Sequence, residues 1–463
     1  MNIKEKSVAS LIMQIVLFVF SIYFIFSGFK IRPDLTFYQL SLYGTVISVI
    51  IWVNIIGLSG SVFSNISLIY LSFVLFQFGV PILYATERSY DNFYIDLFNS
   101  SVLNSGAVFT IICIQAFALG ITLYYLKSNN HGNLIFARTK WANNNLLVEE
   151  SSLILFNVCL VIYLPFTLYG AFILHSRFSM PAIGGLAKQF IFPAALLYLC
   201  YSKNKKVRFF VYFMYIFECI ASMMTGGRTE GVLPLLVLIA YYFQYGNKKK
   251  KFSFVRFVTL IISMIIIVFL IVIIAKLREG NSISGSELSL KSIYESLIGE
   301  LGFNFTTILF VITGTQFFGL KYGSSYLASF ISLIPNTLDP FGIVNKAQLI
   351  SGSNWLQQSY GNYFGFGLGF SLIGEAYYNF GIYGFIVIFF LGFLIANLQS
   401  KPAELCTNWE KYIQLALLLG ILTVTRRDFY QLLKQIEYSI FVMALYIFMY
   451  GEFTIEMKHK VKK

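Results

Sequence analysis

The feature that most constrains this chain is a series of apolar segments, each about 20 residues long. A segment of that length can cross the hydrocarbon core of a bilayer as one α-helix. Charged residues make up only 12% of the 463 residues, whereas soluble proteins carry about 25%. The sequence therefore predicts an all-α polytopic membrane protein.

The apolar segments predict about twelve transmembrane helices. Their ranges are 8–28, 37–58, 62–84, 102–126, 152–174, 183–202, 208–225, 230–246, 254–276, 376–398, 411–425 and 435–451. Nine of these helices fall in residues 1–276, and three fall in residues 376–463, which also contain a polar tail. Residues 277–375 form one long loop whose apolar parts, such as "LIGELGFNFTTILFVITG", predict helices that lie on or dip into the membrane.

The placement of basic residues orients the predicted helices. If both termini are cytoplasmic, the cytoplasmic loops and tails hold every dense cluster of Lys and Arg, including "GNKKKK" and "KHKVKK". Membrane proteins concentrate basic residues on the cytoplasmic side. The net charge of +13 is explained by these loops, so we expect no nucleic-acid partner. The loop over 277–375 is then on the outer face.

Few side chains suit a metal or a disulfide framework. The five cysteines are dispersed without a CxxC pair, and the three histidines lie far apart in the sequence. The sequence also lacks a P-loop, a GxGxxG after a strand, and HExxH. We therefore predict neither a metal site nor a cofactor.

The segment "TGGRTE" interrupts an apolar run on the predicted outer face. Gly226 and Gly227 allow backbone amides to approach a ligand closely, and Arg228 adds a planar fork of donors suited to phosphate. A helix begins nearby, and its N-terminus favours an anion. Alternatively the segment is a turn in which Arg228 pairs with Glu230 or extends to the membrane interface.

Two further arginine sites are predicted on the same face. Arg278 lies where the ninth predicted helix meets the long loop, and Arg426 and Arg427 lie in a short connection before Asp428. Interfacial anchoring and a helix-end ion pair are the structural alternatives. Because arginine binds phosphates with charge-assisted, often bidentate bonds, we expect the three sites to converge on a lipid-linked phosphate or pyrophosphate.

The segment "GEAYYNFG" enters the tenth predicted helix. Glu375, Tyr378 and Asn379 are spaced to share one helix face. Glu375 could be a general base for a sugar hydroxyl, or a helix N-terminal charge favoured by the macrodipole. The preceding "SGSNWLQQSYGNYF" is rich in aromatic and amide side chains, so we expect Trp355 and Tyr360 to bind the sugar substrate together with Tyr378 and Asn379.

The chain resembles bacterial O-antigen polymerases of the Wzy type, within the wider O-antigen polymerase and ligase superfamily. The resemblance rests on "TGGRTEG" opening a helix, "AKLREG" leading into the long loop, and "GFSLIGEAYYNFGIYGF" closing it. It implies a GT-C-like, metal-independent glycosyltransferase in the bacterial inner membrane with its active face periplasmic. Its substrates would be oligosaccharides on undecaprenyl pyrophosphate, and its expected protein partner a chain-length regulator.

The resemblance also implies roles for individual residues. Arg228, Arg278 and Arg426 or Arg427 would stabilise the departing pyrophosphate. Related ligases carry a histidine near the end of the loop, ahead of an Asn and a GxxG. Here Glu375 precedes Asn379 and "GIYG" without a histidine, and would be the base.

Three other functions fit some of these features. A lipid-linked oligosaccharide flippase also has about twelve helices, but its two similar halves have short loops. A ligase would transfer finished glycan to another acceptor, and its expected histidine is missing. A channel or scaffold leaves the outer-face arginines without a role.

Overall fold

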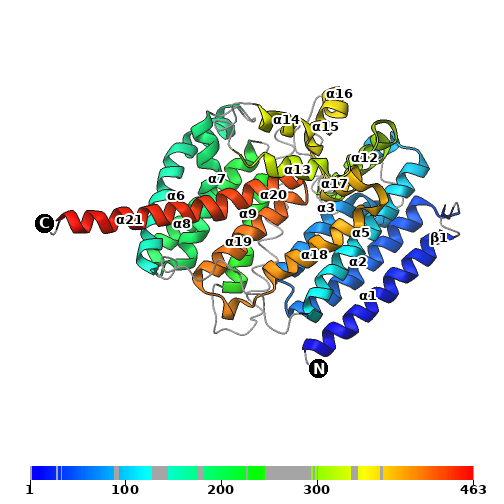
Figure 1. Cartoon of the computed structure of the whole chain (residues 1–463), viewed down its shortest axis with the longest axis horizontal. Helices are drawn as coiled ribbons and strands as arrows, with labels where there is room; N and C mark the ends of the chain where they lie inside the picture. Colours follow the sequence, from blue (N-terminus) through cyan, green and yellow to red (C-terminus); the bar gives the residue numbers. More distant parts are fainter. Residues whose placement is uncertain are drawn as a thin grey trace, which may run out of the picture. The chain divides into compact units, whose positions relative to one another are not determined.

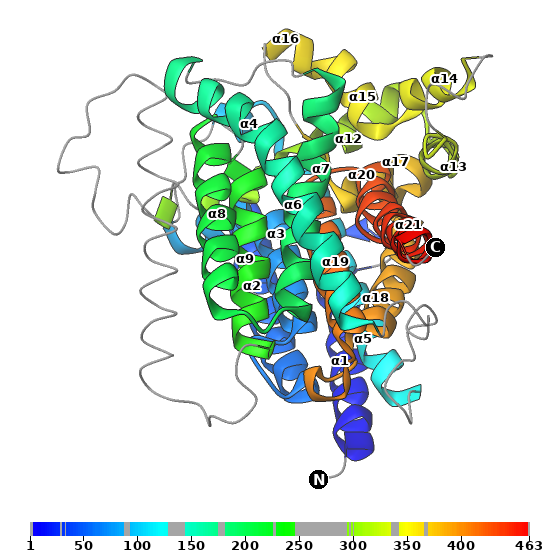
Figure 2. The same cartoon turned by 90° about the vertical axis from the view of Figure 1, so that its left-hand side faces the viewer.

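The computed structural model describes residues 3–27, 30–32, 34–87, 93–127, 144–174, 181–225, 228–245, 294–295, 298–299, 301–334, 342–364 and 369–461. These residues are helical apart from loops and two short strands, β1 (Phe26–Ser27) and β2 (Lys30–Ile31), which pair antiparallel. Figures 1 and 2 show the helices from two directions. The chain divides into two compact units, which are described separately.

The first unit comprises residues 1–132, 294–400 and 421–433. Its helices are α1 (Ile3–Ile25), α2 (Phe37–Ser59), α3 (Asn65–Glu87), α4 (Phe93–Asp96), α5 (Ser100–Lys127), α12 (Asn304–Phe318), α13 (Ser324–Ile331), α14 (Ile343–Ile350), α15 (Gly352–Leu356), η5 (Gln357–Gly361), α16 (Asn362–Phe364), α17 (Leu372–Phe380), η6 (Gly381–Gly384) and α18 (Phe385–Gln399).

The second unit comprises residues 133–293, 401–420 and 434–463. Its helices are α6 (Asn145–Leu168), η2 (Tyr169–Leu174), α7 (Ala182–Tyr201), α8 (Lys205–Met224), α9 (Arg228–Tyr245), η7 (Ala403–Leu405), η8 (Glu437–Val442) and α21 (Met443–Val461). Helices α19 (Asn408–Val424) and α20 (Phe429–Ile436) are divided between the two units. Within the second unit α6 packs on α7, and α8 packs on α9.

Nine helical segments of the described residues are long and apolar enough to cross a membrane. They are Glu5–Ile25, Phe37–Ser59, Asn65–Glu87, Ser100–Lys127, Asn145–Leu174, Ile183–Tyr201, Lys205–Met224, Leu372–Gln399 and Phe429–Phe453. Each coincides with one of the twelve predicted helices. A polytopic, helical membrane protein is therefore confirmed.

The three remaining predicted helices are not confirmed as full spans. The apolar part of α9 is the short segment Glu230–Tyr245. Helix α19 has only 17 residues, which extend about 26 Å at 1.5 Å per residue, less than the roughly 30 Å hydrocarbon thickness of a bilayer. The predicted helix over 254–276 lies outside the described residues, as do residues 277–293 of the predicted loop.

Close packing within the first unit depends on glycines where α5 and α18 run side by side (Figure 1). A Cβ on Gly120 would lie 2.1 Å from the carbonyl oxygen of Phe389, and one on Gly392 would lie 2.2 Å from that of Phe117. Small residues allow such close backbone approach between membrane helices. These two glycines therefore set the spacing between α5 and α18.

The described part of the predicted long loop is largely helical. Its apolar helix α12 packs against α3, α5 and α17, and residues Asn304 to Ile312 are buried. Helix α12 is thus a buried core element of the first unit, and its predicted placement on or partly in the membrane stays a prediction. It supplies one wall of the polar network described below.

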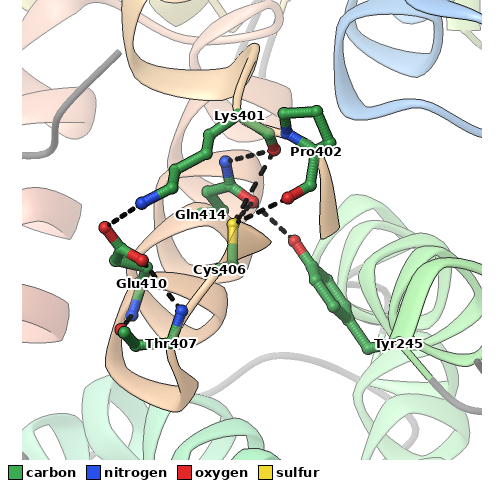
Figure 3. Close-up of polar contacts among 7 residues, drawn as sticks. All are labelled: Tyr245, Lys401, Pro402, Cys406, Thr407, Glu410 and Gln414. Atoms are coloured by element: carbon green, nitrogen blue, oxygen red, sulfur yellow. Dashed lines mark hydrogen bonds and ion pairs between the residues drawn. The ribbon is translucent and has the colours of Figure 1, made fainter. Parts of the chain in front are cut away.

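A polar cluster orders the short connection between α18 and α19 in the second unit (Figure 3). Thr407 and Glu410 form a reciprocal capping box, with Thr407 N donating to Glu410 Oε2 at 2.8 Å and Glu410 N donating to Thr407 Oγ1 at 3.3 Å. Lys401 pairs with Glu410. Gln414 donates to the carbonyl of Lys401 at 3.1 Å and accepts from Tyr245 Oη at 2.6 Å, which attaches the end of α9 to α19.

Replacing Gly120 or Gly392 with alanine is expected to destabilise the protein. Each added Cβ meets a backbone oxygen that cannot move independently of its helix, and overpacking of this kind costs about 1–3 kcal/mol. The measurement is thermal unfolding of the detergent-solubilised variants.

Gly57→Ala is the matched control, because a Cβ at Gly57 of α2 meets no atom within 4 Å. We expect this variant to be at least as stable as the original, since alanine favours helix by about 1 kcal/mol over glycine. Equal stability of all three variants would contradict the proposed close approach of α5 and α18.

Candidate functional site

The two adjacent arginines Arg426 and Arg427 lie in a tight turn between α19 and α20. The turn continues the end of α19, because Arg426 N donates to Thr423 O and Arg427 N donates to Val424 O, both at 3.2 Å. Both arginine residues are half-buried, while the flanking Thr425 and Asp428 are 1% exposed. The turn therefore carries two partly accessible guanidinium groups between two buried residues.

Two buried amide side chains hold the first end of this turn. Asn304 Nδ2 of α12 donates to the carbonyl oxygen of Thr425 at 2.7 Å, and Gln77 Nε2 of α3 donates to the same oxygen. Gln77 and Asn304 are 0% and 1% exposed. A carbonyl with two lone pairs can accept both bonds, so Thr425 O is fully satisfied by residues distant in sequence.

Glu375 holds the other end of the turn. Its Oε2 accepts a hydrogen bond of 2.6 Å from the backbone N–H of Phe429, the first residue of α20, and its Oε1 accepts one of 2.7 Å from Ser325 Oγ. The Glu375 side chain is 0% exposed. A carboxylate at a helix N-terminus satisfies an otherwise unpaired N–H and interacts favourably with the helix dipole. Both oxygens of Glu375 therefore already have donors.

The neighbours of Glu375 on α17 extend the network. Asn379 Nδ2 donates to the carbonyl of Glu375 at 2.9 Å and to Ser325 Oγ at 2.7 Å, while Asn379 Oδ1 accepts from Gly323 N at 3.0 Å. Ser371, the N-cap of α17, donates to Gln77 and accepts from Gly374 N at 3.1 Å. Glu375 and Asn379 thus lie one turn apart, as their spacing predicts.

Asp428 is the second buried carboxylate at the turn. Its Oδ2 accepts a hydrogen bond from Ser353 Oγ of α15. Burial raises the pKa of the Asp428 carboxyl above its ordinary value, while hydrogen bonds from the Ser353 side chain and from the backbone of Ser353 and Gln431, and the charge of Arg427, act in the opposite direction. The sequence predicts for Asp428 only the role of partner in a helix-end ion pair.

The aromatic residues predicted to hold sugar pack on one another. The ring centroids of Trp355 and Tyr378 are 4.8 Å apart, and those of Tyr360 and Phe310 are also 4.8 Å apart. Gly314 makes room for this packing, because a Cβ there would lie 2.6 Å from Trp355 Cη2. Tyr378 is only 1% exposed, whereas Trp355 and Tyr360 are half-buried. Sugar contact by Trp355, Tyr360 or Tyr378 stays a prediction.

The "TGGRTE" segment belongs to the second unit. Arg228 begins α9, but its side chain is not described, and Gly226, Gly227 and Arg278 lie outside the described residues. Glu230 forms an ion pair with Lys188 of α7, a lysine that sequence reasoning did not single out. The expected convergence of Arg228 and Arg278 with Arg426 and Arg427 stays a prediction.

Several members of the network could not be recognised from the sequence. Gln77, Asn304 and Ser371 are isolated polar residues within or beside apolar helices, whereas Ser325 and Ser353 lie in short runs of small polar residues. Polar side chains at membrane depth usually face the protein interior, which is the only signal that marked them. In the described part of the chain, no three or more His, Cys, Asp or Glu side chains are grouped as for a metal ion.

Comparison with known sequences identifies the family. No curated protein and no solved structure matches the chain. The family model described as O-antigen polysaccharide polymerase Wzy, however, matches residues 10–458, nearly the entire length. The chain therefore belongs to the Wzy family of O-antigen polysaccharide polymerases.

Proposed function

We propose that this chain joins oligosaccharide repeat units carried on undecaprenyl pyrophosphate, at the periplasmic face of the bacterial inner membrane. The growing glycan is transferred from one lipid carrier to the non-reducing end of the next repeat unit. Family membership supports polymerisation of O-antigen. The observation that carries the site assignment is the buried network that holds the Arg426–Arg427 turn from both ends.

In the proposed reaction, the acceptor hydroxyl attacks the anomeric carbon of the donor glycan. The bond from that carbon to the pyrophosphate oxygen breaks, and negative charge develops on the departing oxygen. Arg426 and Arg427 stabilise this charge. Preorganised donors contribute most where their backbone is already held, because no reorganisation is needed during reaction.

We propose a positioning role for Glu375 in place of the general base that the sequence predicted. Both oxygens of Glu375 are engaged by donors of the protein itself, and the residue is 0% exposed. By holding Phe429 N it instead keeps the preceding arginine turn in place. Asn379 supports this arrangement by holding Ser325 and the backbone of Glu375.

The arginine assignment predicts that Arg426→Ala and Arg427→Ala shorten the surface glycan to single repeat units. Losing one preorganised donor to a developing oxyanion typically lowers the rate about 100- to 1,000-fold. Lysine at either position retains charge without the planar fork, so an intermediate chain length is expected. The measurement is gel analysis of surface glycan from cells that lack the native copy and carry each variant.

Arg32→Ala is the control, because Arg32 is also a half-buried arginine on the predicted outer face but lies far from the network in sequence. We expect normal chains from this variant. Long chains from both Arg426→Ala and Arg427→Ala, at normal protein level, would overturn the assignment. Lipid-linked repeat units retained on the cytoplasmic leaflet after deletion of the protein would favour a flippase instead.

The positioning role predicts different outcomes for two substitutions of Glu375. Glutamine can still accept from Phe429 N and face Ser325, so Glu375→Gln is expected to retain activity within a few-fold. Glu375→Ala leaves buried donors unpaired, at about 1–3 kcal/mol each, and should lose both stability and chain length. Equal loss of activity in the two variants, with the glutamine variant fully folded, would restore Glu375 as the base.

A further inference from the structure

Asp428 has a carboxylate oxygen that the surrounding network leaves open. Its Oδ2 accepts from Ser353 Oγ, but among the described residues its Oδ1 is buried without a hydrogen-bond partner. The residue is 1% exposed. Leaving a buried carboxylate oxygen unpaired is costly, so such an oxygen is a candidate for contact with a ligand.

The carboxylates of Asp428 and Glu375 differ in how many of their oxygens accept a hydrogen bond. Both carboxylates lie at the N-terminus of α20, since Glu375 accepts from Phe429 N and Asp428 immediately precedes that residue. Glu375 has a donor on each oxygen, whereas Asp428 Oδ1 has none among the residues that the structure describes. Of the two carboxylates, Asp428 is therefore the one with an oxygen that no donor of the described residues engages.

Asp428 is also adjacent in sequence to the two arginines. A carboxylate beside Arg426 and Arg427 is positioned at the same turn that is proposed to receive the pyrophosphate. Burial strengthens the proton affinity of such a group. A base and a leaving-group site on one turn would hold the attacking hydroxyl and the departing pyrophosphate close to each other.

We infer that Asp428 is the general base that receives the proton of the acceptor sugar hydroxyl, through Oδ1. This inference rests on the proposed polymerase function. In the step, the hydroxyl oxygen forms a bond to the anomeric carbon while its proton passes to the Asp428 carboxylate. The bond from the anomeric carbon to the pyrophosphate oxygen breaks, and its electron pair leaves with the lipid pyrophosphate. Ser353 holds Oδ2 and thereby directs Oδ1.

A structural role for Asp428 as the N-cap of α20 is the alternative, and asparagine separates the two. Asparagine is as good an N-cap as aspartate and can accept the hydrogen bond from Ser353, but it cannot take a proton at neutral pH. Asp428→Asn should therefore fold normally and bind substrate, yet lose about 100-fold or more in polymerisation rate, the usual contribution of general base catalysis.

The experiment uses the full-length protein in proteoliposomes, with lipid-linked repeat units extracted from cells that lack this protein. Chain formation, binding of the lipid-linked repeat unit and thermal unfolding are each measured for the original protein, Asp428→Asn and Asp428→Gly. Sodium formate is added as an external base to each protein. Restoration of chain formation by formate in Asp428→Gly alone is the expected result.

The outcomes separate the inference from the function on which it rests. If the original protein forms no chains, the proposed function fails. If it forms chains and Asp428→Asn forms them at the same rate, polymerisation stands and the base assignment is overturned. If Asp428→Asn unfolds and formate has no effect on Asp428→Gly, Asp428 is a structural cap and the inference is likewise overturned.

Discussion

The arrangement of the first unit depends on one buried polar network that holds the turn from Thr425 to Phe429. Gln77 and Asn304 hold the carbonyl at its start, and Glu375 holds the N–H at its end. These contacts connect α3, α12 and α17 to the junction of α19 and α20. Displacing the turn would leave several of these buried donors and acceptors unpaired at once, at about 1–3 kcal/mol each.

The network explains why apolar helices of this unit carry isolated amides and hydroxyls. Outside the network, helices such as α5 and α18 achieve close contact through glycine instead, with Gly120 and Gly392 set against backbone oxygens. Glycine contact and polar contact serve different purposes. Glycines bring two helices together, whereas the network fixes the position of a non-helical turn that carries charge.

The helical, membrane-spanning character of the chain was predictable, because hydropathy measures the transfer of each segment into the bilayer and needs no knowledge of neighbours. Whether each predicted helix is long enough to cross the membrane was less predictable. Helix α19 has only 17 residues and ends at the polar turn that begins with Thr425, and the apolar part of α9 is described over Glu230–Tyr245. The sequence predicts a helix over α12 within the long loop, and only the structure shows that it is buried in the core of the first unit.

The candidate site, too, was predictable from the sequence only in part. Composition and charge placement alone select Arg426, Arg427 and Glu375 as unusual residues for a membrane chain, because a charge there is costly without a partner or a task. Only the tertiary structure decides which contacts these residues make. Ser325 and Phe429, which donate hydrogen bonds to Glu375, lie 50 and 54 residues away from it in the sequence. Hydrogen-bond pairing over such distances depends on how helices pack, which no local pattern of residues encodes.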